Sequence, residues 1–398
     1  MGSRGRWPKG AIRQVALSPN TELLRFASTF FNQTAAAFRS EHGGGGTIPA
    51  MNRAIVRTGL EALYFSGSHV LLRPLVGGIG TILTLHHVRP VGRNPFQPNR
   101  LLEVTPDFLE YTIRTIRRAG IELVSLDEMH RQLTQGTGKR RFTCLTFDDG
   151  YRDNLRNAHP ILKRYEVPYA IYVATNFPDG LGKLWWLALE AIILKNDRIG
   201  IVVDDQDRWF ECSTIPAKRE LFTALYWWMR GLSTPELSRI VHDLAARYDV
   251  DLRALCQEQC MTWVEIAELA ADPLVTVGAH SVSHNALAKM SEDNVRSEMR
   301  SSATIIEAAL GVRPQHFCYP LGDQASAGPR EFAIARALGF KTAVTTRPGV
   351  LFPQHRDYLT ALPRISLNGE YQQRRFLQVL LSGAATAVWN NFRRVDAE

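Results

Sequence analysis

Cysteine is scarce in this sequence, and its pattern excludes one class of protein. The 398 residues contain five cysteines, an odd number spread over a long chain: Cys144, Cys212, Cys256, Cys260 and Cys318. A disulfide framework uses regularly spaced pairs in a short secreted chain, so this pattern favours a reducing compartment. The first 50 residues also lack an apolar run long enough for a signal peptide or membrane span, because Arg13, Arg25, Arg39 and four glycines at 43–46 interrupt them. We therefore expect a cytoplasmic protein.

The sequence lacks any RNA- or DNA-reading motif, although its formal net charge is +8 and its pI is about 9.3. A mildly basic enzyme is the simpler interpretation of this charge, so nucleic acid is not an expected partner. Hydrophobic residues make up 45% of the chain, which indicates a substantial core. The length suits one large α/β barrel or two smaller domains.

Composition and periodicity divide the chain into segments. The Gly/Ser/Thr-rich stretch before Met51 is aperiodic, so it is either a disordered tail or a start assigned too early. Beyond it, a basic amphipathic pattern predicts a helical segment that covers the barrel or contacts the inner face of a membrane through residues 51–77. The expected units are a tail at 1–50, the basic helical segment at 51–80, a barrel at 81–180 and 261–370, an inserted Trp-rich helical subdomain at 181–260 and a C-terminal helix at 371–398.

Short apolar runs alternate with helical patterns through most of the chain. The strand-like runs 81–85, 142–147, 169–174 and 275–277 are separated by predicted helices, and this alternation implies parallel strands. In parallel β/α barrels, active sites gather at the carboxyl ends of the strands. Side chains that directly follow these runs are therefore the candidates for chemistry.

Two such strand ends carry paired ionisable residues. Asp148 and Asp149 follow the run 142–147, and His280 and His284 follow the run 275–277 as a His-x-x-x-His motif. Two imidazoles and one carboxylate form a three-ligand site for a divalent ion with an open position for water, and a second carboxylate is left to move a proton. This combination is typical of a metal hydrolase.

Four motifs in order resemble the polysaccharide deacetylase superfamily, the NodB homology domain of carbohydrate esterase family 4. They are Thr-Phe-Asp-Asp-Gly at 146–150, Gly-Ala-His-Ser-Val-Ser-His at 278–284, Tyr-Pro-Leu-Gly-Asp at 319–323 and Leu-Pro-Arg-Ile at 362–365. The resemblance implies a distorted (β/α) barrel, here with an inserted, mostly helical subdomain. It also implies an N-acetylated oligo- or polysaccharide as substrate. No oligomeric state follows from it.

The resemblance assigns roles to residues at matching positions. It implies that Asp149, His280 and His284 bind the metal while Asp148 is the base that assists attack of a metal-activated water on the acetyl carbonyl. Such a ligand set suits Zn²⁺ best, with Co²⁺, Ni²⁺, Mn²⁺ or Fe²⁺ as alternatives. The backbone amide of Leu321 matches the family's oxyanion donor. Substrate-binding roles are expected for the rest of that motif: Tyr319, Pro320 and Asp323.

The chain departs from the family pattern at two positions. Cys318 stands where the common third motif begins with an arginine, so Arg364 of the fourth motif is the candidate to hold Asp148 ionised. The family's late Leu-x-His, which supplies the general acid, is absent. Biofilm poly-N-acetylglucosamine deacetylases look like permuted forms with this histidine on the first strand. By that resemblance His86 is the acid and His87 the reserve, because neighbouring strand residues point to opposite faces.

Other interpretations remain open at this stage. The same centre could act as an O-acetyl esterase, and the missing fifth motif is compatible with a catalytically impaired saccharide-binding member. Cys256 and Cys260 with the histidine pair imitate a zinc finger at unusual spacing. Aromatic residues of the insert could stack on sugars or pack in a core: Trp185, Trp186, Trp209, Trp227 and Trp228.

Overall fold

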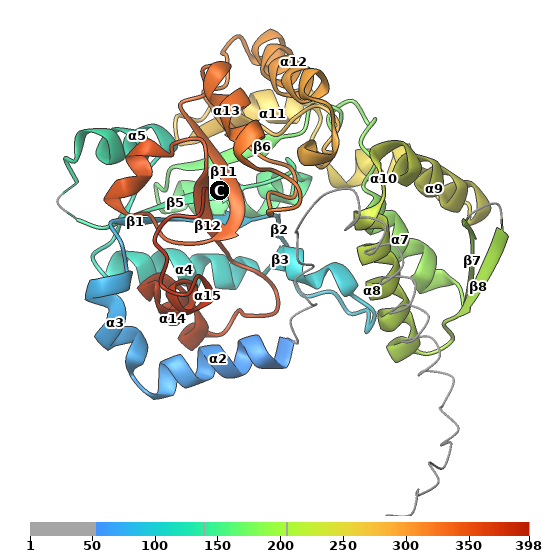
Figure 1. Cartoon of the computed structure of the whole chain (residues 1–398), viewed down its shortest axis with the longest axis horizontal. Helices are drawn as coiled ribbons and strands as arrows, with labels where there is room; N and C mark the ends of the chain where they lie inside the picture. The colour runs from blue at the N-terminus through green and yellow to red at the C-terminus, as the bar shows by residue number, and fades with distance from the viewer. Residues whose placement is uncertain (1–52, 139, 204–205, 398) are drawn as a thin grey trace, which may run out of the picture. The chain divides into compact units, whose positions relative to one another are not determined.

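The computed structural model describes residues 53–138, 140–203 and 206–397 (Figure 1). The expectation for residues 1–50 lies outside these ranges. In the described part of the chain, no helix is both long and apolar enough to cross a bilayer.

Seven parallel strands close into a barrel. The sheet order is β1-β12-β11-β10-β9-β6-β5, and β1 pairs with β5 as well as with β12, while a short β4 extends the sheet beyond β5. Going round the barrel, the seven strands therefore follow chain order, as expected for consecutive β/α units. Their bounds are β1 Gly80–Leu85, β4 Glu122–Leu123, β5 Phe142–Phe147, β6 Tyr169–Val173, β9 Val275–Ala279, β10 His316–Cys318, β11 Thr342–Pro348 and β12 Leu362–Ser366. The predicted distorted (β/α) barrel is confirmed.

Alternating strand residues separate two layers of the core. Ile82, Cys144 and Tyr172 belong to a cluster inside the barrel, whereas Leu83 and Leu145 belong to the cluster between the strands and the outer helices. This is the two-residue period of a β-strand. The inward-facing positions of β1 and β5 are the even-numbered ones, and the series continues past the strand ends to His86 and Asp148. These two side chains therefore point toward the barrel axis.

Helices surround the barrel and cover the outer core layer. Several begin at a side-chain cap: Thr105 accepts from the Phe108 N–H at 3.1 Å, and Thr262 forms a capping box with Glu265. The helices are α4 Pro106–Arg118, α5 Leu126–Gln135, α6 His159–Arg164, α11 Trp263–Ala270, α12 Glu292–Leu310 and α13 Pro329–Ala337, and a two-stranded ladder joins β2 His87–Val88 to β3 Glu103–Val104. Short irregular helices are η1 Pro98–Leu102, the π-turn η2 Asn154–Ala158, η3 Leu287–Lys289 and η4 Pro353–Asp357.

The segment between β6 and α11 has its own core. It contains α7 Trp185–Lys195, the antiparallel strands β7 Arg198–Val203 and β8 Gln206–Glu211, α8 Ile215–Gly231, α9 Thr234–Arg247 and α10 Leu252–Gln259. The β7–β8 hairpin is an addition to the expected helices. Trp185 and Trp186 are buried in this core, which also includes Phe96, Tyr151 and Phe177 from the barrel side. Its apolar core therefore reaches the barrel rim.

Both ends of the described chain form helices that pack together. Helices α2 Arg53–Phe65 and α3 Ser68–Val76 precede β1, and α14 Arg374–Ser382 and α15 Ala384–Trp389 follow β12. Figure 1 shows the two pairs side by side, and Leu60 of α2 is buried with Phe376 and Val379 of α14. Two helices thus stand in each of the regions where the sequence predicted one helical segment.

Candidate active site

The three predicted metal ligands converge at the carboxyl ends of β5 and β9. The Asp149 Oδ1 atom lies 3.0 Å from His284 Nε2 and 3.4 Å from His280 Nε2, and all three side chains are buried or nearly so. Asp149 Oδ1 is buried without a hydrogen bond of acceptable geometry among the described residues. The carboxylate oxygen and the two imidazole nitrogens thus bring their lone pairs close together without hydrogen bonds between them. Such a group of donor atoms fits a shared cation. These donors therefore fit a divalent metal.

Hydrogen bonds orient each ligand. His280 donates from Nδ1 to the Cys318 carbonyl at 2.7 Å, which leaves its Nε2 lone pair directed at Asp149. The loop that carries His284 is held by Glu298 of α12, whose carboxylate accepts from the backbone N–H groups of Val282 and Ser283 at 2.8 and 2.9 Å. Glu298 also accepts from the Ser283 hydroxyl at 2.8 Å, and it lies outside the sequence motifs.

Left-handed backbone conformations concentrate at this site. Asp149, Ser281, His284 and Leu321 have φ values of 71°, 62°, 57° and 63°. Non-glycine residues adopt such values rarely and at an energetic cost, so the surrounding structure must impose them. The sharp turn at Asp149 and Gly150 is what aims two adjacent aspartates at different partners.

Asp148 is held by the arginine that the sequence nominated. Arg364 of β12 donates to both carboxylate oxygens of Asp148 at 2.7 Å and to the Cys318 sulfur at 3.2 Å, and its side chain is fully buried. Burial alone would raise the pKa of Asp148, but the charge and hydrogen bonds of Arg364 outweigh it and lower the pKa to about 2. The small Cys318 side chain leaves room for this guanidinium inside the barrel.

The two histidines after β1 point to opposite sides. His86 Nε2 lies 3.9 Å from Asp148 Oδ2 and remains partly exposed at the strand end. His87 is buried outside the barrel, donates from Nδ1 to Asp153 at 2.7 Å and stacks on Tyr151. Burial lowers the pKa of His86, although the charges of Asp148 and Asp149 oppose this. Of the two, His86 is therefore the one that faces Asp148.

The third motif contributes backbone groups and one side chain. Among the described residues, the Leu321 N–H has no protein partner, which leaves it available to an anionic oxygen. The Tyr319 side chain is fully buried outside the barrel and donates to the Thr360 carbonyl at 2.8 Å. This corrects the expected substrate contact at Tyr319, because strand alternation turns its ring away from the site. Pro320, between them, is buried, and Asp323 accepts from Arg230 of α8 at 2.5 Å.

Two further residues border the site without having been predicted. The Tyr151 hydroxyl and the Trp186 indole nitrogen are buried with no hydrogen-bond partner among the described residues, and the Trp186 ring lies 5.2 Å from that of His284. Burial and the charge of Asp149 raise the pKa of Tyr151 well above its usual value, so this hydroxyl stays protonated. Tyr151 directly follows the Asp-Asp-Gly motif, which is the only sequence signal for it. Trp186 reaches the site through the packing of the insert.

The competing metal motif does not assemble. Cys256 donates to the Phe177 carbonyl at 3.5 Å, and within the described ranges neither Cys256 nor Cys260 joins the histidines in a group of possible ligands. All five cysteines are free and buried. A zinc finger built from this pair and the His280 motif is therefore wrong.

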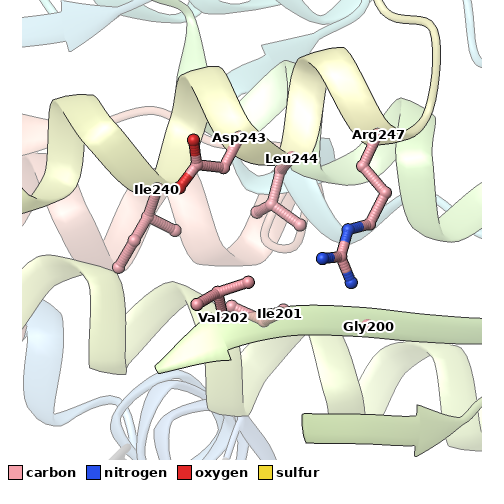
Figure 2. A pocket seen from close by; sticks show the side chains of 7 residues that line it. All are labelled: Gly200, Ile201, Val202, Ile240, Asp243, Leu244 and Arg247. Atoms are coloured by element: carbon pink, nitrogen blue, oxygen red, sulfur yellow. The ribbon is translucent and has the colours of Figure 1, made fainter. Parts of the chain in front are cut away.

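A small apolar pocket lies elsewhere, within the insert. Figure 2 shows it between β7 and α9, lined by Gly200, Ile201, Val202, Ile240, Asp243, Leu244 and Arg247. Its two charged residues already have partners, Arg247 with Asp207 at 2.8 Å and Asp243 with Arg239 at 3.1 Å. The pocket shares no residue with the site and offers no reactive group.

Comparison with known proteins finds similarity in sequence and in fold. A sequence model of the polysaccharide deacetylase family matches residues 135–190 and 239–343. The Streptococcus pyogenes deacetylase PplD, solved with acetate, is 18% identical with a TM-score of 0.50, covering 75% of this chain and 97% of that one. IcaB from Ammonifex degensii is 18% identical with a TM-score of 0.48, covering 78% and 98%. No curated protein sequence matches.

PplD has the same closed-barrel fold, and in this chain carboxylates and histidines lie at the carboxyl ends of the strands. The family model matches 161 of the 398 residues, so the chain is similar to the polysaccharide deacetylases over that part, and this similarity supports a hydrolase that acts on amides. The family match stops at residue 190 and resumes at 239, so the whole of α8 and the β7–β8 hairpin lie outside it.

Proposed function

We propose that this enzyme removes N-acetyl groups from an N-acetylated saccharide, using a divalent metal ion held by Asp149, His280 and His284. The observation that carries the proposal is the convergence of these three side chains beside an ionised, arginine-bound Asp148. A bound ion would polarise the acetyl carbonyl and lower the pKa of water in the site. Zn²⁺ suits two imidazoles and a carboxylate best.

The chain's own residues would move the protons. Asp148 accepts a proton from the attacking water, and Arg364 keeps it ionised and fixed in direction. His86, which faces Asp148, donates a proton to the leaving nitrogen as the carbon–nitrogen bond breaks. The Leu321 N–H donates to the oxyanion that forms on the acetyl oxygen. The products are acetate and a free amine on the sugar.

The position of His86 favours an amide over an ester as substrate. An amine leaves poorly without a proton, whereas an alkoxide leaving group demands less protonation. A histidine 3.9 Å from the carboxylate that serves as base is suited to this task. We therefore place the N-acetyl group ahead of the O-acetyl ester.

The test combines activity with metal binding. Acetate release from N-acetylglucosamine oligomers with added Zn²⁺ should fall by roughly 10²–10⁴-fold in Asp148→Asn. Zn²⁺ should raise the melting temperature of the wild type and of Asp148→Asn, but not of His284→Asn, because ligands that bind only the folded state stabilise it. Folding of each variant is checked by circular dichroism. Equal turnover by Asp148→Asn would overturn the assigned base, and an inert wild type that still binds oligomers would identify a saccharide-binding member.

A further inference from the structure

Helices α2 and α3 expose an apolar face that nothing in the described chain covers. Five of its large apolar side chains are between 62% and 76% exposed: Ile55, Phe65, Val70, Leu71 and Leu75. Soluble surfaces normally scatter such residues singly. Here they fall within two consecutive short helices.

Helical periodicity places the exposed apolar residues of α3 on one side of that helix. In α3, Val70, Leu71, Pro74 and Leu75 are exposed at spacings of one, four and five residues, which brings them onto one side of the helix. The opposite side carries the buried His69 and Val76. The fold is therefore anchored by one side of α3, and the other side is left apolar and open.

The charges beside this face are positive. Arg73 is exposed on α3, and its charge together with burial lowers the pKa of Arg141 to about 10. Arg141 donates to the Gly77 carbonyl at 2.6 Å, but its Nε and one terminal nitrogen are buried without a partner. The acidic residue of α2, Glu61, already accepts from Arg57 and Arg375. Arg141 is thus enclosed in the fold, and Arg73, for which no acidic partner is found among the described residues, is the exposed charge beside the apolar face.

We propose that the outer side of α3, formed by Val70, Leu71 and Leu75 with Arg73 beside them, docks on an anionic lipid bilayer, and that the exposed Ile55 and Phe65 of the preceding α2 add apolar surface. Apolar side chains would enter the headgroup boundary while the Arg73 guanidinium pairs with a lipid phosphate. A second copy of the chain fits less well, because it would bring the Arg73 side chains of both copies together. Residues 1–50 hold six basic and two acidic side chains, so their net charge is positive. This charge is attracted by an anionic surface and repelled by the basic face of α3.

Docking would fix the direction of the active site. Helix α3 leads into the amino end of β1, whereas His86 follows its carboxyl end. Helix α3 and the catalytic residues thus lie toward opposite ends of β1. The active site would open away from the bilayer, toward substrate in the aqueous phase. This inference is independent of the reaction proposed above.

The test is sedimentation of the full chain with vesicles of phosphatidylcholine alone or with about one third phosphatidylglycerol. We expect binding to the anionic vesicles, weakened about tenfold or more by Leu71→Gln with Leu75→Gln, and about fivefold by Arg73→Gln at low salt. The matched control is Val264→Gln with Val312→Gln, which removes equally exposed apolar side chains elsewhere and should leave binding unchanged.

Three results would overturn the proposal. They are no binding of the wild type to anionic vesicles, equal loss in the control pair, and a dimer that the Leu71→Gln, Leu75→Gln variant converts to a monomer in light scattering. The last result would assign the surface to a second copy of the chain. Melting temperatures equal to that of the wild type show that the exposed substitutions leave the fold intact.

Discussion

Asp148 and Arg364 form a fully buried ion pair, and its energetics depend on both members. A buried pair contributes little net stability, but removing one partner leaves an uncompensated charge in a region of low dielectric constant. Because Arg364 makes two bonds to Asp148 and also donates to the Thr345 carbonyl, it fixes the direction of the carboxylate as well as its charge. The pair is therefore a positioning device as well as an electrostatic one.

We predict that Arg364→Met destabilises the protein by about 3–5 kcal/mol, because Asp148 then remains buried without its partner. Asp148→Asn combined with Arg364→Met should be less destabilised than the sum of the single changes by about 1–3 kcal/mol. Urea unfolding of the four proteins measures both quantities. As a control, Arg313→Met removes an exposed partner of Glu307 and should change stability by less than about 1 kcal/mol. Strict additivity of the buried pair would contradict the coupling.

His86 should matter more for amides than for esters. We predict that His86→Ala lowers kcat on an N-acetylated oligomer by about 10²-fold or more, with a smaller loss on an aryl acetate ester whose leaving group needs no proton. His87→Asn is a poor control because His87 is buried, so the partly exposed His130→Asn serves instead. Equal losses on both substrates would remove His86 as the acid.

At the level of secondary structure, the insert reaches the active site through α7 and α8. Arg230 at the end of α8 binds Asp323 and donates to Ser326 at 3.1 Å, and its guanidinium lies 6.0 Å from the Trp227 ring. Trp227 is 42% exposed, whereas Trp185 and Trp186 are buried. Trp185 and Trp186 are therefore core residues, whereas the Trp227 ring is exposed next to the loop of the third motif.

We predict that Trp227→Ala raises KM for longer N-acetylglucosamine oligomers several-fold, with less effect on the dimer, because an exposed aromatic face can stack on a distal sugar ring. The matched control is Trp209→Ala. It removes a tryptophan of the β7–β8 hairpin that is similarly exposed and that contacts the guanidinium groups of Arg198 and Arg247. A ratio of variant to wild-type KM that is the same for the dimer and for the longer oligomers would exclude stacking at Trp227, as would an equal effect of Trp209→Ala.

Strand alternation explains which parts of the site the sequence could predict. Positions 86 and 148 continue the inward series of β1 and β5, so counting by two along an apolar run selects His86 over His87. The same alternation predicts that Tyr319 points away from the site, because Cys318 before it points into the barrel. Tyr151 could not be placed in this way, because the left-handed turn at Asp149 and Gly150 breaks the period just before it. The contribution of Trp186 depends on long-range packing that no local pattern records.

At the scale of the whole molecule, His355 links folding to pH. It is 1% exposed, its Nδ1 accepts from the Phe352 N–H at 3.0 Å, and burial lowers its pKa to about 4. The folded protein therefore resists protonation that the unfolded chain accepts near pH 6.5. This contribution to stability is intact above pH 6.5 and is lost as pH falls toward 4.

We predict that lowering the pH from 7 to 4.5 costs the wild type roughly 2–3 kcal/mol more unfolding free energy than His355→Asn, whose amide can accept the same hydrogen bond without titrating. Urea unfolding at the two pH values gives the difference, in which other titrating groups cancel. The exposed His242→Asn should follow the wild type. Parallel pH dependence of all three proteins would assign the acid sensitivity to another group.

The barrel closes between the first and last of its strands. Because β1 pairs with both β5 and β12, its second neighbour is synthesised some 280 residues after it, and such a non-local contact forms late. The carboxylate and both imidazoles that converge on one point directly follow β5 and β9, whereas Arg364 lies on β12. A nascent chain could thus acquire its metal donors while still on the ribosome, yet gain an oriented Asp148 only once the cylinder is sealed.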